Sequence, residues 1–148
     1  MGYKRAEGVK AQLRHARVKL KHLVEAAGAL RGLSVNRAQA YLADVLARRR
    51  CVPFRRFKGG VGRCRQAKQF RTVQGRWPMK AARCLRGLLR SALANAEHLG
   101  RDPDELKVGL VQANAAPIVT RNTFRAHGRI NPYRTHPSHI QLVLTSLV

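Results

Sequence analysis

Acidic residues are scarce in this sequence of 148 residues. Only 7 Asp and Glu accompany 30 Lys and Arg, which gives a formal net charge of +23 with neutral histidines. A compact protein with that charge repels itself, so we expect a polyanionic partner. Aromatic residues are also few, at 5% against 45% hydrophobic residues overall. We therefore expect one domain over residues 1–148 with a core built mainly from Leu, Val and Ala.

Long apolar runs and a cysteine framework are missing as well. No segment reaches the ~18 consecutive apolar residues of a membrane span, and no apolar signal-peptide core follows the basic residues Lys4 and Arg5. Cys51, Cys64 and Cys84 are too few and too irregularly spaced for a secreted disulfide framework. These absences favour a soluble intracellular protein without a membrane span, whose cysteines are free thiols.

The sequence also lacks the groupings that catalysis or metal binding requires. Cys51 and Cys64 are too far apart for the paired spacing of a zinc site. Neither cysteine has a carboxylate near it in sequence that could complete a catalytic group with His127, and the glycines of residues 59–62 are not followed by the Lys-Ser/Thr of a phosphate-binding loop. We expect no catalytic residues, no metal and no cofactor, and hence no enzyme.

The few acids leave two parts of the chain entirely without negative charge. Glu7, Glu25 and Asp44 are scattered, and the other four acids cluster in residues 97–105. Half of the 30 basic residues fall in residues 48–90, within the first acid-free stretch, and a second stretch runs from Leu106 to the end. A solvated charged face would normally mix both signs, so the pattern indicates two separate anion-binding regions.

Helical periodicity appears first in two segments. Apolar residues recur at helical spacing from Leu20 to Leu30, and Gly32 follows as a stop signal. Ser34 is a suitable N-cap for a second helix, whose apolar stripe ends just before the arginines of residues 48–50. Those arginines would complement the negative end of the helix dipole.

A third helix and three strands complete the expected elements. Pro78 is well suited to be the first residue of a long helix that ends at Gly100. Alternation of apolar and polar residues predicts strands at residues 106–113 and 140–145. Residues 9–18 fit a short edge strand, which we favour, or an extended arm or an early helical turn.

Residues 115–139, between the last two strands, contain few large aliphatic side chains. If the strands pair as a hairpin, each leg to a turn near Gly128 spans roughly 40 Å, at ~3.3 Å per residue. The radius of gyration of a chain of this length is only about 15 Å. We therefore expect an arm that projects beyond the body, with a positive φ at Gly128 where the chain reverses.

Periodicity disappears in residues 51–77, which predicts a long ordered loop or a disordered tail inside the chain. Phe54, Phe57, Phe70 and Trp77 alternate there with cations and glycines. Arginine binds phosphate and stacks on bases, and aromatic side chains also stack on unpaired bases, so we expect nucleic-acid contact. The alternative is that the aromatic side chains anchor the loop to the helices while its cations face water.

Five segments occur in order: CVPFRRFKGGVGRCRQAKQF, QGRWP, SALANAEHLG, NTFRAHGRINPY and SHIQLVLT. Together they strongly resemble, over nearly the whole chain, the universal large-subunit ribosomal protein family numbered twenty-two in bacteria and seventeen in the older eukaryotic naming. The loop at residues 51–77 resembles an insertion of the archaeal and eukaryotic members, which favours a cytoplasmic eukaryotic ribosome. Many eukaryotic members continue into a Lys-rich tail, so an end at Val148 suggests a reduced version.

The resemblance implies an α+β fold with three helices packed on a small antiparallel sheet, a long projecting β-hairpin and a basic internal loop. It implies a structural constituent of the large ribosomal subunit that binds ribosomal RNA, contacts neighbouring large-subunit proteins, and lines the nascent-peptide exit tunnel with its hairpin at residues 115–139. Charge alone also permits a DNA-architectural or chromatin-associated protein, which we keep as the alternative.

The charge pattern and the resemblance together give the candidate site residues. The loop residues expected to bind RNA are Arg55, Arg56, Lys58, Gly60, Arg63, Arg65, Lys68, Arg71, Arg76 and Trp77. The hairpin residues expected in the tunnel wall, where they would meet the nascent peptide, are Arg121, Phe124, Arg125, His127, Gly128, Arg129 and Asn131. His136 and His139, beside the last strand, are expected to face RNA or solvent.

Overall fold

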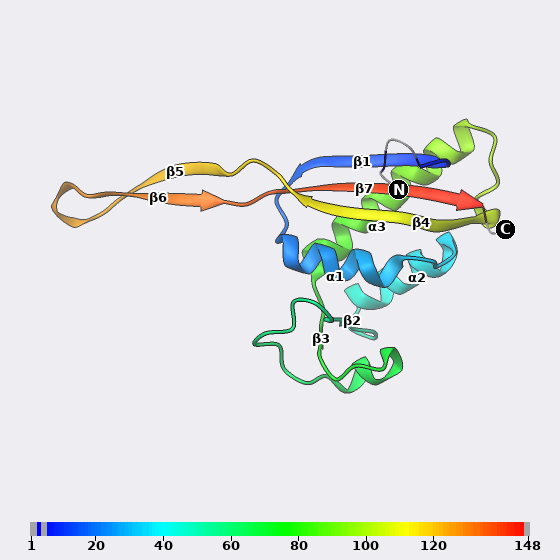
Figure 1. The fold of residues 1–148 in the computed structure, drawn as a ribbon, viewed down its shortest axis with the longest axis horizontal. Helices are drawn as coiled ribbons and strands as arrows, with labels where there is room; N and C mark the ends of the chain where they lie inside the picture. Colours follow the sequence, from blue (N-terminus) through cyan, green and yellow to red (C-terminus); the bar gives the residue numbers. More distant parts are fainter. Residues whose placement is uncertain (1–2, 4–5, 147–148) are drawn as a thin grey trace.

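The structure is a computed structural model that describes residues 3 and 6–146. In this part of the chain, three α-helices pack on one side of a three-stranded antiparallel sheet, and a two-stranded arm projects from the sheet's end (Figure 1). The expected α+β fold class is confirmed. The expectations for the N-terminal residues 1–5 and for the end at Val148 fall largely outside the described residues.

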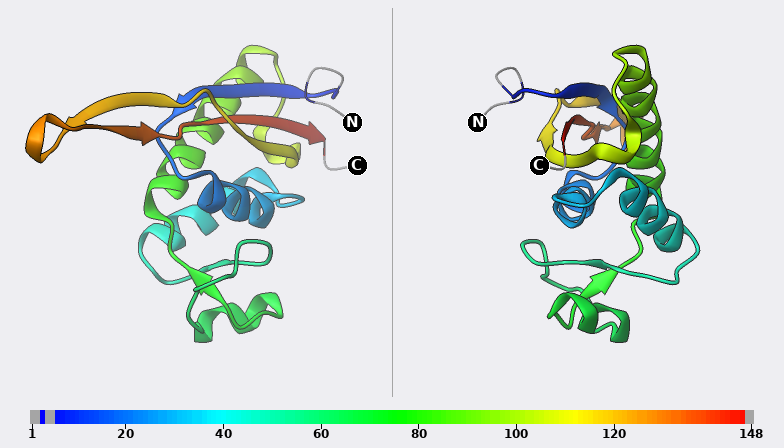
Figure 2. Two further views of the ribbon diagram at one scale, coloured as in Figure 1. Left: turned by 60° about the vertical axis from the view of Figure 1, so that its left-hand side comes forward. Right: turned by 90° about the vertical axis from the view of Figure 1, so that its right-hand side faces the viewer.

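The sheet consists of β1 (Val9–Ala16), β4 (Leu106–Ala115) and β7 (Ser138–Ser146) in the order β1-β7-β4. Residues 9–18 therefore contain the favoured edge strand. Because side chains alternate along a strand, the aligned residues Ala11, Leu142 and Val111 all point into the core. The opposite face of the sheet is mostly polar, apart from the buried Val143, and is not covered by the helices (Figure 2).

The helices are α1 (Leu20–Leu30), α2 (Val35–Leu46) and α3 (Met79–His98). Helix α1 packs under β4, α3 packs under β1, and α2 packs against α3. Their buried faces and the inner face of the sheet form one core of mainly Leu, Val and Ala, as expected. Burial of each Leu or Val in such a core contributes about 1.5–3 kcal/mol.

The helix termini differ from the sequence prediction in three details. Ser34 occupies the N-cap position of α2, but its hydroxyl makes no capping hydrogen bond. Pro78 is the N-cap residue of α3 instead of its first helical residue. The arginines after α2 lie beyond its last turn, because the backbone turns left-handed at Arg48 (φ 58°). Arg49 instead forms an ion pair with Asp44, with 3.1 Å between Nε and Oδ1.

The arm consists of β5 (Val119–Phe124) and β6 (Ile130–Thr135), which pair antiparallel and extend the line of β4 and β7 (Figure 1). The chain reverses in a short 3₁₀ turn, η3 (Ala126–Gly128). Gly128 has a positive φ of 66°, as predicted, and so does its neighbour His127 at 58°. The expected projecting hairpin is confirmed.

Residues 51–77 form an ordered lobe on the side of the helices away from the sheet (Figure 2). Its two short strands, β2 (Val52–Pro53) and β3 (Gly75–Arg76), pair with each other, and a 3₁₀ helix η1 (Arg65–Phe70) lies between them. These elements are too short to produce a recognisable hydrophobic period. Of the two alternatives for this segment, the ordered loop is therefore the correct one.

Candidate nucleic-acid interface

A buried carboxylate fastens the basic loop to the body. Glu25 lies on the inner side of α1 and is only 6% exposed. Its Oε2 accepts a hydrogen bond from the backbone N–H of Arg55 at 3.0 Å, and its Oε1 accepts bonds from Arg56 at 2.8 Å and Phe57 at 2.7 Å. Hydrogen bonds to an ionised group are about twice as strong as neutral ones. Glu25 therefore fixes the backbone on which the first loop arginines are carried.

The aromatic side chains of the loop differ in burial. Phe54 is buried, and Phe57, Phe70 and Trp77 are half-buried. The indole N–H of Trp77 donates to Oε1 of Gln66 at 3.0 Å, so its polar group is already used within the loop. Phe54 is therefore enclosed in the body, whereas Phe57, Phe70 and Trp77 keep part of their ring surface accessible, and base stacking by these three rings stays a prediction. The alternative interpretation, in which an aromatic side chain holds the loop in place, fits the buried ring of Phe54.

The loop cations, in contrast, all face outward. Every Lys and Arg predicted to bind RNA in residues 55–76 is exposed, and within the described residues none forms an ion pair with a carboxylate. Arg55 donates instead to the carbonyl of Phe70 at 3.2 Å, and Arg76 donates to the carbonyl of Gly60 at 2.8 Å. These bonds orient the guanidinium groups and leave their positive charge uncompensated.

The positive charge also affects the pKa of a histidine at the junction between the loop and α1. Burial, followed by the charges of Lys19 and Arg76, lowers the pKa of His22 below its usual value. The His22 ring contacts Phe54 edge-to-face, with 5.6 Å between the centroids. His22 is therefore neutral at neutral pH and belongs to the packing of the junction.

The cysteines form no candidate catalytic or metal site. All three are free, and Cys51 and Cys64 are near each other. Burial, followed by the proximity of Cys64, raises the pKa of the Cys51 thiol to about 11. His127 is at the far end of the arm and is not brought near either thiol. Among the described residues there is no group of three or more potential metal ligands.

The arm is a second exposed surface of mixed character. Phe124 is 80% exposed, and Tyr133, Ile130 and Ile118 are each more than half exposed. All the hairpin residues predicted for the tunnel wall are exposed and lie on β5, the turn or the start of β6. The tip is closed by a hydrogen bond from the Arg125 N–H to the Arg129 carbonyl at 2.8 Å. Apolar rings and cations therefore alternate on a narrow two-stranded ribbon that carries no acid.

The two basic surfaces do not meet. The loop lies on the helical side of the body, whereas the arm leaves from the end of the sheet (Figures 1 and 2). Within the part of the chain that the structure describes, no helix has the length and apolar character needed to cross a membrane. The geometry is that of a folded body with two separate cationic contact regions.

Comparison with known proteins gives one consistent result. The sequence model of the ribosomal protein L22p/L17e family matches residues 11–145. The chain is 53% identical to large ribosomal subunit protein uL22 of Phlebotomus papatasi over 131 residues, which cover 88% of this chain and 70% of that protein. It is 54% identical to the uL22 of Biphyllus lunatus over 92% of this chain and 75% of that one. For the uL22 of Drosophila melanogaster, the identity is 51% over 95% of this chain and 75% of the relative.

Proposed function

The chain belongs to the ribosomal protein L22p/L17e family, and from that premise we propose that it binds large-subunit ribosomal RNA through its basic loop and lines the peptide exit tunnel with its arm. As a member of this family, it is a structural component of the large ribosomal subunit and not an enzyme. The sequence prediction agrees with this assignment. We place the protein in the cytoplasm, on the large subunit, beside neighbouring large-subunit proteins.

The observation that best supports RNA binding is the exposure of the loop cations. They are exposed and unpaired with acids in the described residues, on a backbone held by Glu25. Because the loop is ordered before binding, less conformational entropy is lost when RNA docks on it. The proposed RNA contacts of residues 51–77 are Arg55, Arg56, Lys58, Gly60, Arg63, Arg65, Lys68, Arg71 and Arg76. Trp77, which is half-buried, belongs to the same proposed set of contacts.

The shape and surface of the arm support the tunnel assignment. A two-stranded hairpin with no third strand is marginal in water, and this one exposes Phe124 at 80% and Tyr133 at 62%. Such a ribbon is stabilised when it is enclosed by other material, and its cations suit RNA. We assign the tunnel wall to Arg121, Phe124, Arg125, His127, Gly128, Arg129 and Asn131, where the apolar rings and the nascent peptide can meet.

The DNA-architectural alternative gains no support from the relatives, each of which is named as a large-subunit protein. The division of a single domain into a loop at residues 51–77 and an arm at residues 115–139 is part of the proposal. In this division, the loop docks on ribosomal RNA and the arm reaches into the tunnel.

Charge reversal in the loop tests the proposal. We expect Arg55, Arg56 and Arg63, changed together to Glu, to retain the helical circular-dichroism signal but to lose stable incorporation into large subunits. The affinity of the wild-type protein for purified large-subunit RNA should fall steeply with salt, because neutralised phosphates release counterions. The matched control changes Arg17, Arg37 and Arg101 to Glu. These arginines are exposed, lie outside both acid-free stretches, and carry the same change in charge.

Two results would contradict the proposal. If the control variant lost incorporation as completely as the loop variant, net charge would govern binding and the loop would have no special role. If wild-type protein associated with chromatin in cell fractionation and not with large subunits, the DNA-architectural alternative would be favoured.

A further inference from the structure

The uncovered face of the sheet carries a row of three glutamines. Gln12 on β1 is aligned with Gln141 on β7, which is aligned with Gln112 on β4. Two residue pairs closer to the arm, Asn114 lies opposite His139. These positions alternate with the buried residues of each strand, so their side chains lie on the side away from the helices.

An irregularity in β1 adds two further side chains to this surface. The register shifts between Leu13 and Ala16, so that Arg14 and His15 together face the single residue His139. His15 has a φ of 54°, a conformation that non-glycine residues seldom adopt and that costs of order 1–3 kcal/mol. Bulges of this kind re-aim side chains and are common at functional sites.

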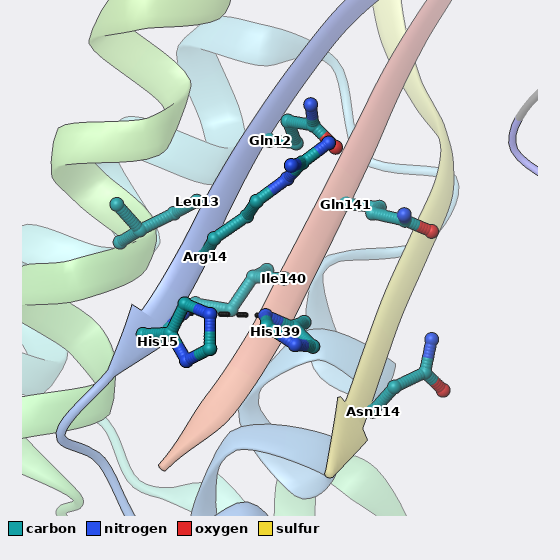
Figure 3. A pocket seen from close by; sticks show the side chains of 8 residues that line it. All are labelled: Gln12, Leu13, Arg14, His15, Asn114, His139, Ile140 and Gln141. Atoms are coloured by element: carbon teal, nitrogen blue, oxygen red, sulfur yellow. Dashed lines mark hydrogen bonds between the residues drawn. The ribbon is translucent and has the colours of Figure 1, made fainter. Parts of the chain in front are cut away.

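The bulge brings the two imidazoles together. The rings of His15 and His139 pack edge-to-face with 4.7 Å between centroids, and the backbone N–H of His15 donates to Nδ1 of His139 at 3.2 Å (Figure 3). Because Nδ1 of His139 accepts this bond, a neutral His139 carries its proton on Nε2. The ring is thereby fixed in orientation next to the glutamines.

These side chains line a pocket of about 270 Å³, to which Gln12, Arg14, His15, Asn114, His139 and Gln141 contribute (Figure 3). The side chains of Gln12, Arg14, Asn114 and Gln141 make no hydrogen bond to any of the described residues. The pocket is slightly smaller than the sites that hold drug-sized ligands, about 300–1,000 Å³. It is large enough for one flat heterocycle and contains amide donors and acceptors, a cation and no carboxylate.

We propose that this pocket holds one unpaired nucleotide of the RNA that the protein binds, an inference that rests on the proposed function. Asn and Gln amides match the paired donor and acceptor on a base edge, that of adenine above all. An imidazole is a surface on which an unstacked base can pack, and Arg14 is placed to bind its phosphate. The nucleotide must be unpaired, because side chains do not reach the major-groove base edges of an A-form helix.

Base-modification footprinting tests the inference. Purified large-subunit ribosomal RNA is treated with dimethyl sulfate in the presence of the wild-type protein, a Gln12→Ala and Gln141→Ala double variant, or a Gln112→Ala control. Gln112 belongs to the same row of glutamines but does not line the pocket. Circular dichroism checks that all three proteins are folded.

We expect the wild-type protein and the control to protect one unpaired base that the double variant leaves reactive. The double variant should weaken RNA binding by about tenfold or more, the usual effect of losing contacts to one base. Its affinity should keep the same salt dependence, because no charge is removed. An Arg14→Ala variant should instead reduce the slope of log affinity against log salt by about one.

If the double variant matched the wild-type protein in footprint and affinity, the inference alone would be overturned. If the wild-type protein bound adenosine monophosphate through Gln12 and Gln141 but protected no base of the RNA, the pocket would be a site for free nucleotides and not for RNA. If the wild-type protein bound no large-subunit RNA, the proposed function would fail, and this inference with it.

Discussion

Removal of the Glu25 carboxylate is expected to release the start of the basic loop while the body stays folded. In Glu25→Gln, the amide oxygen can replace Oε1 and still accept from the N–H groups of Arg56 and Phe57. The amide nitrogen replaces Oε2 and faces the N–H of Arg55, so that two donors oppose each other. A hydrogen bond to a charged group contributes roughly 1.5–3 kcal/mol, and we expect a loss of that size.

The alanine variant removes all three acceptor contacts. The amides of Arg55, Arg56 and Phe57 are only partly buried, so water replaces part of what is lost. We therefore expect Glu25→Ala to cost about 3–5 kcal/mol locally, which is less than the sum of three separate bonds. The larger loss should appear as opening of the loop, because α1 accepts alanine readily.

Amide hydrogen exchange measures this opening directly. Since about 1.4 kcal/mol corresponds to a factor of ten, exchange at Arg55, Arg56 and Phe57 should accelerate by about 10- to 150-fold in Glu25→Gln and by at least ~100-fold in Glu25→Ala. Exchange in the core strands β4 and β7 should change little. The control is Glu97→Gln, which alters an exposed carboxylate on α3. Unchanged exchange at the loop amides in the alanine variant would refute the anchoring role.

Three further predictions follow from the geometry. A variant with a short turn in place of residues 124–132 should fold and enter large subunits but alter nascent-chain pausing or sensitivity to tunnel-binding drugs. If this variant folded but were excluded from large subunits, the tip would be an assembly contact. Because the pKa of Cys51 is raised to about 11 from 9.0, its burial stabilises the fold below about pH 9, and this contribution should decline as the pH rises toward 11. A Cys51→Ser variant should show a smaller decline between urea unfolding at pH 8 and at pH 10.5, and an equal decline would argue against the shift. Gly8→Ala should destabilise the protein by more than ~2 kcal/mol, since its Cβ would collide with the Leu144 carbonyl at a φ of 128°. In contrast, Gly28→Ala on α1, with open space around its Cβ, should stabilise it by up to ~1 kcal/mol, which urea unfolding can measure.

Much of the fold could be predicted because it depends on local signals. The apolar stripes of α1 and α3, and the alternation of apolar and polar residues in β4 and β7, could be seen in the sequence because they mark the side of each element that is buried. The projecting arm follows from the length of chain between two pairing strands. The helix ends were less predictable, because the surrounding backbone also decides how a terminal residue is used. Ser34 is the N-cap residue of α2 but makes no capping hydrogen bond, and Pro78 is the N-cap residue of α3 and not its first helical residue.

The candidate sites were predictable only where charge reveals them. Exposed arginines can be anticipated from the missing acids, but the partner of Glu25 is a set of backbone amides, and backbone amides leave no mark in a sequence. The pocket around His139 was hidden for a similar reason. It depends on a strand bulge at His15 and on the register that aligns Gln12 with Gln141, and both arise from tertiary pairing.

The attachment of the arm also has a mechanical consequence. Its two legs are joined to β4 and β7 through residues 116–118 and 136–137, and β4 and β7 pair from Leu106 with Ser146 to Ala115 with Ser138. A pull along the arm therefore acts on β4 and β7 in the same direction and does not slide one of these strands past the other. The central strand β7 passes part of the load to β1 through a second ladder. The force on the tip is thus resisted by the hydrogen bonds between β7 and β1, which are loaded in shear, and by the packing of the sheet on the helices.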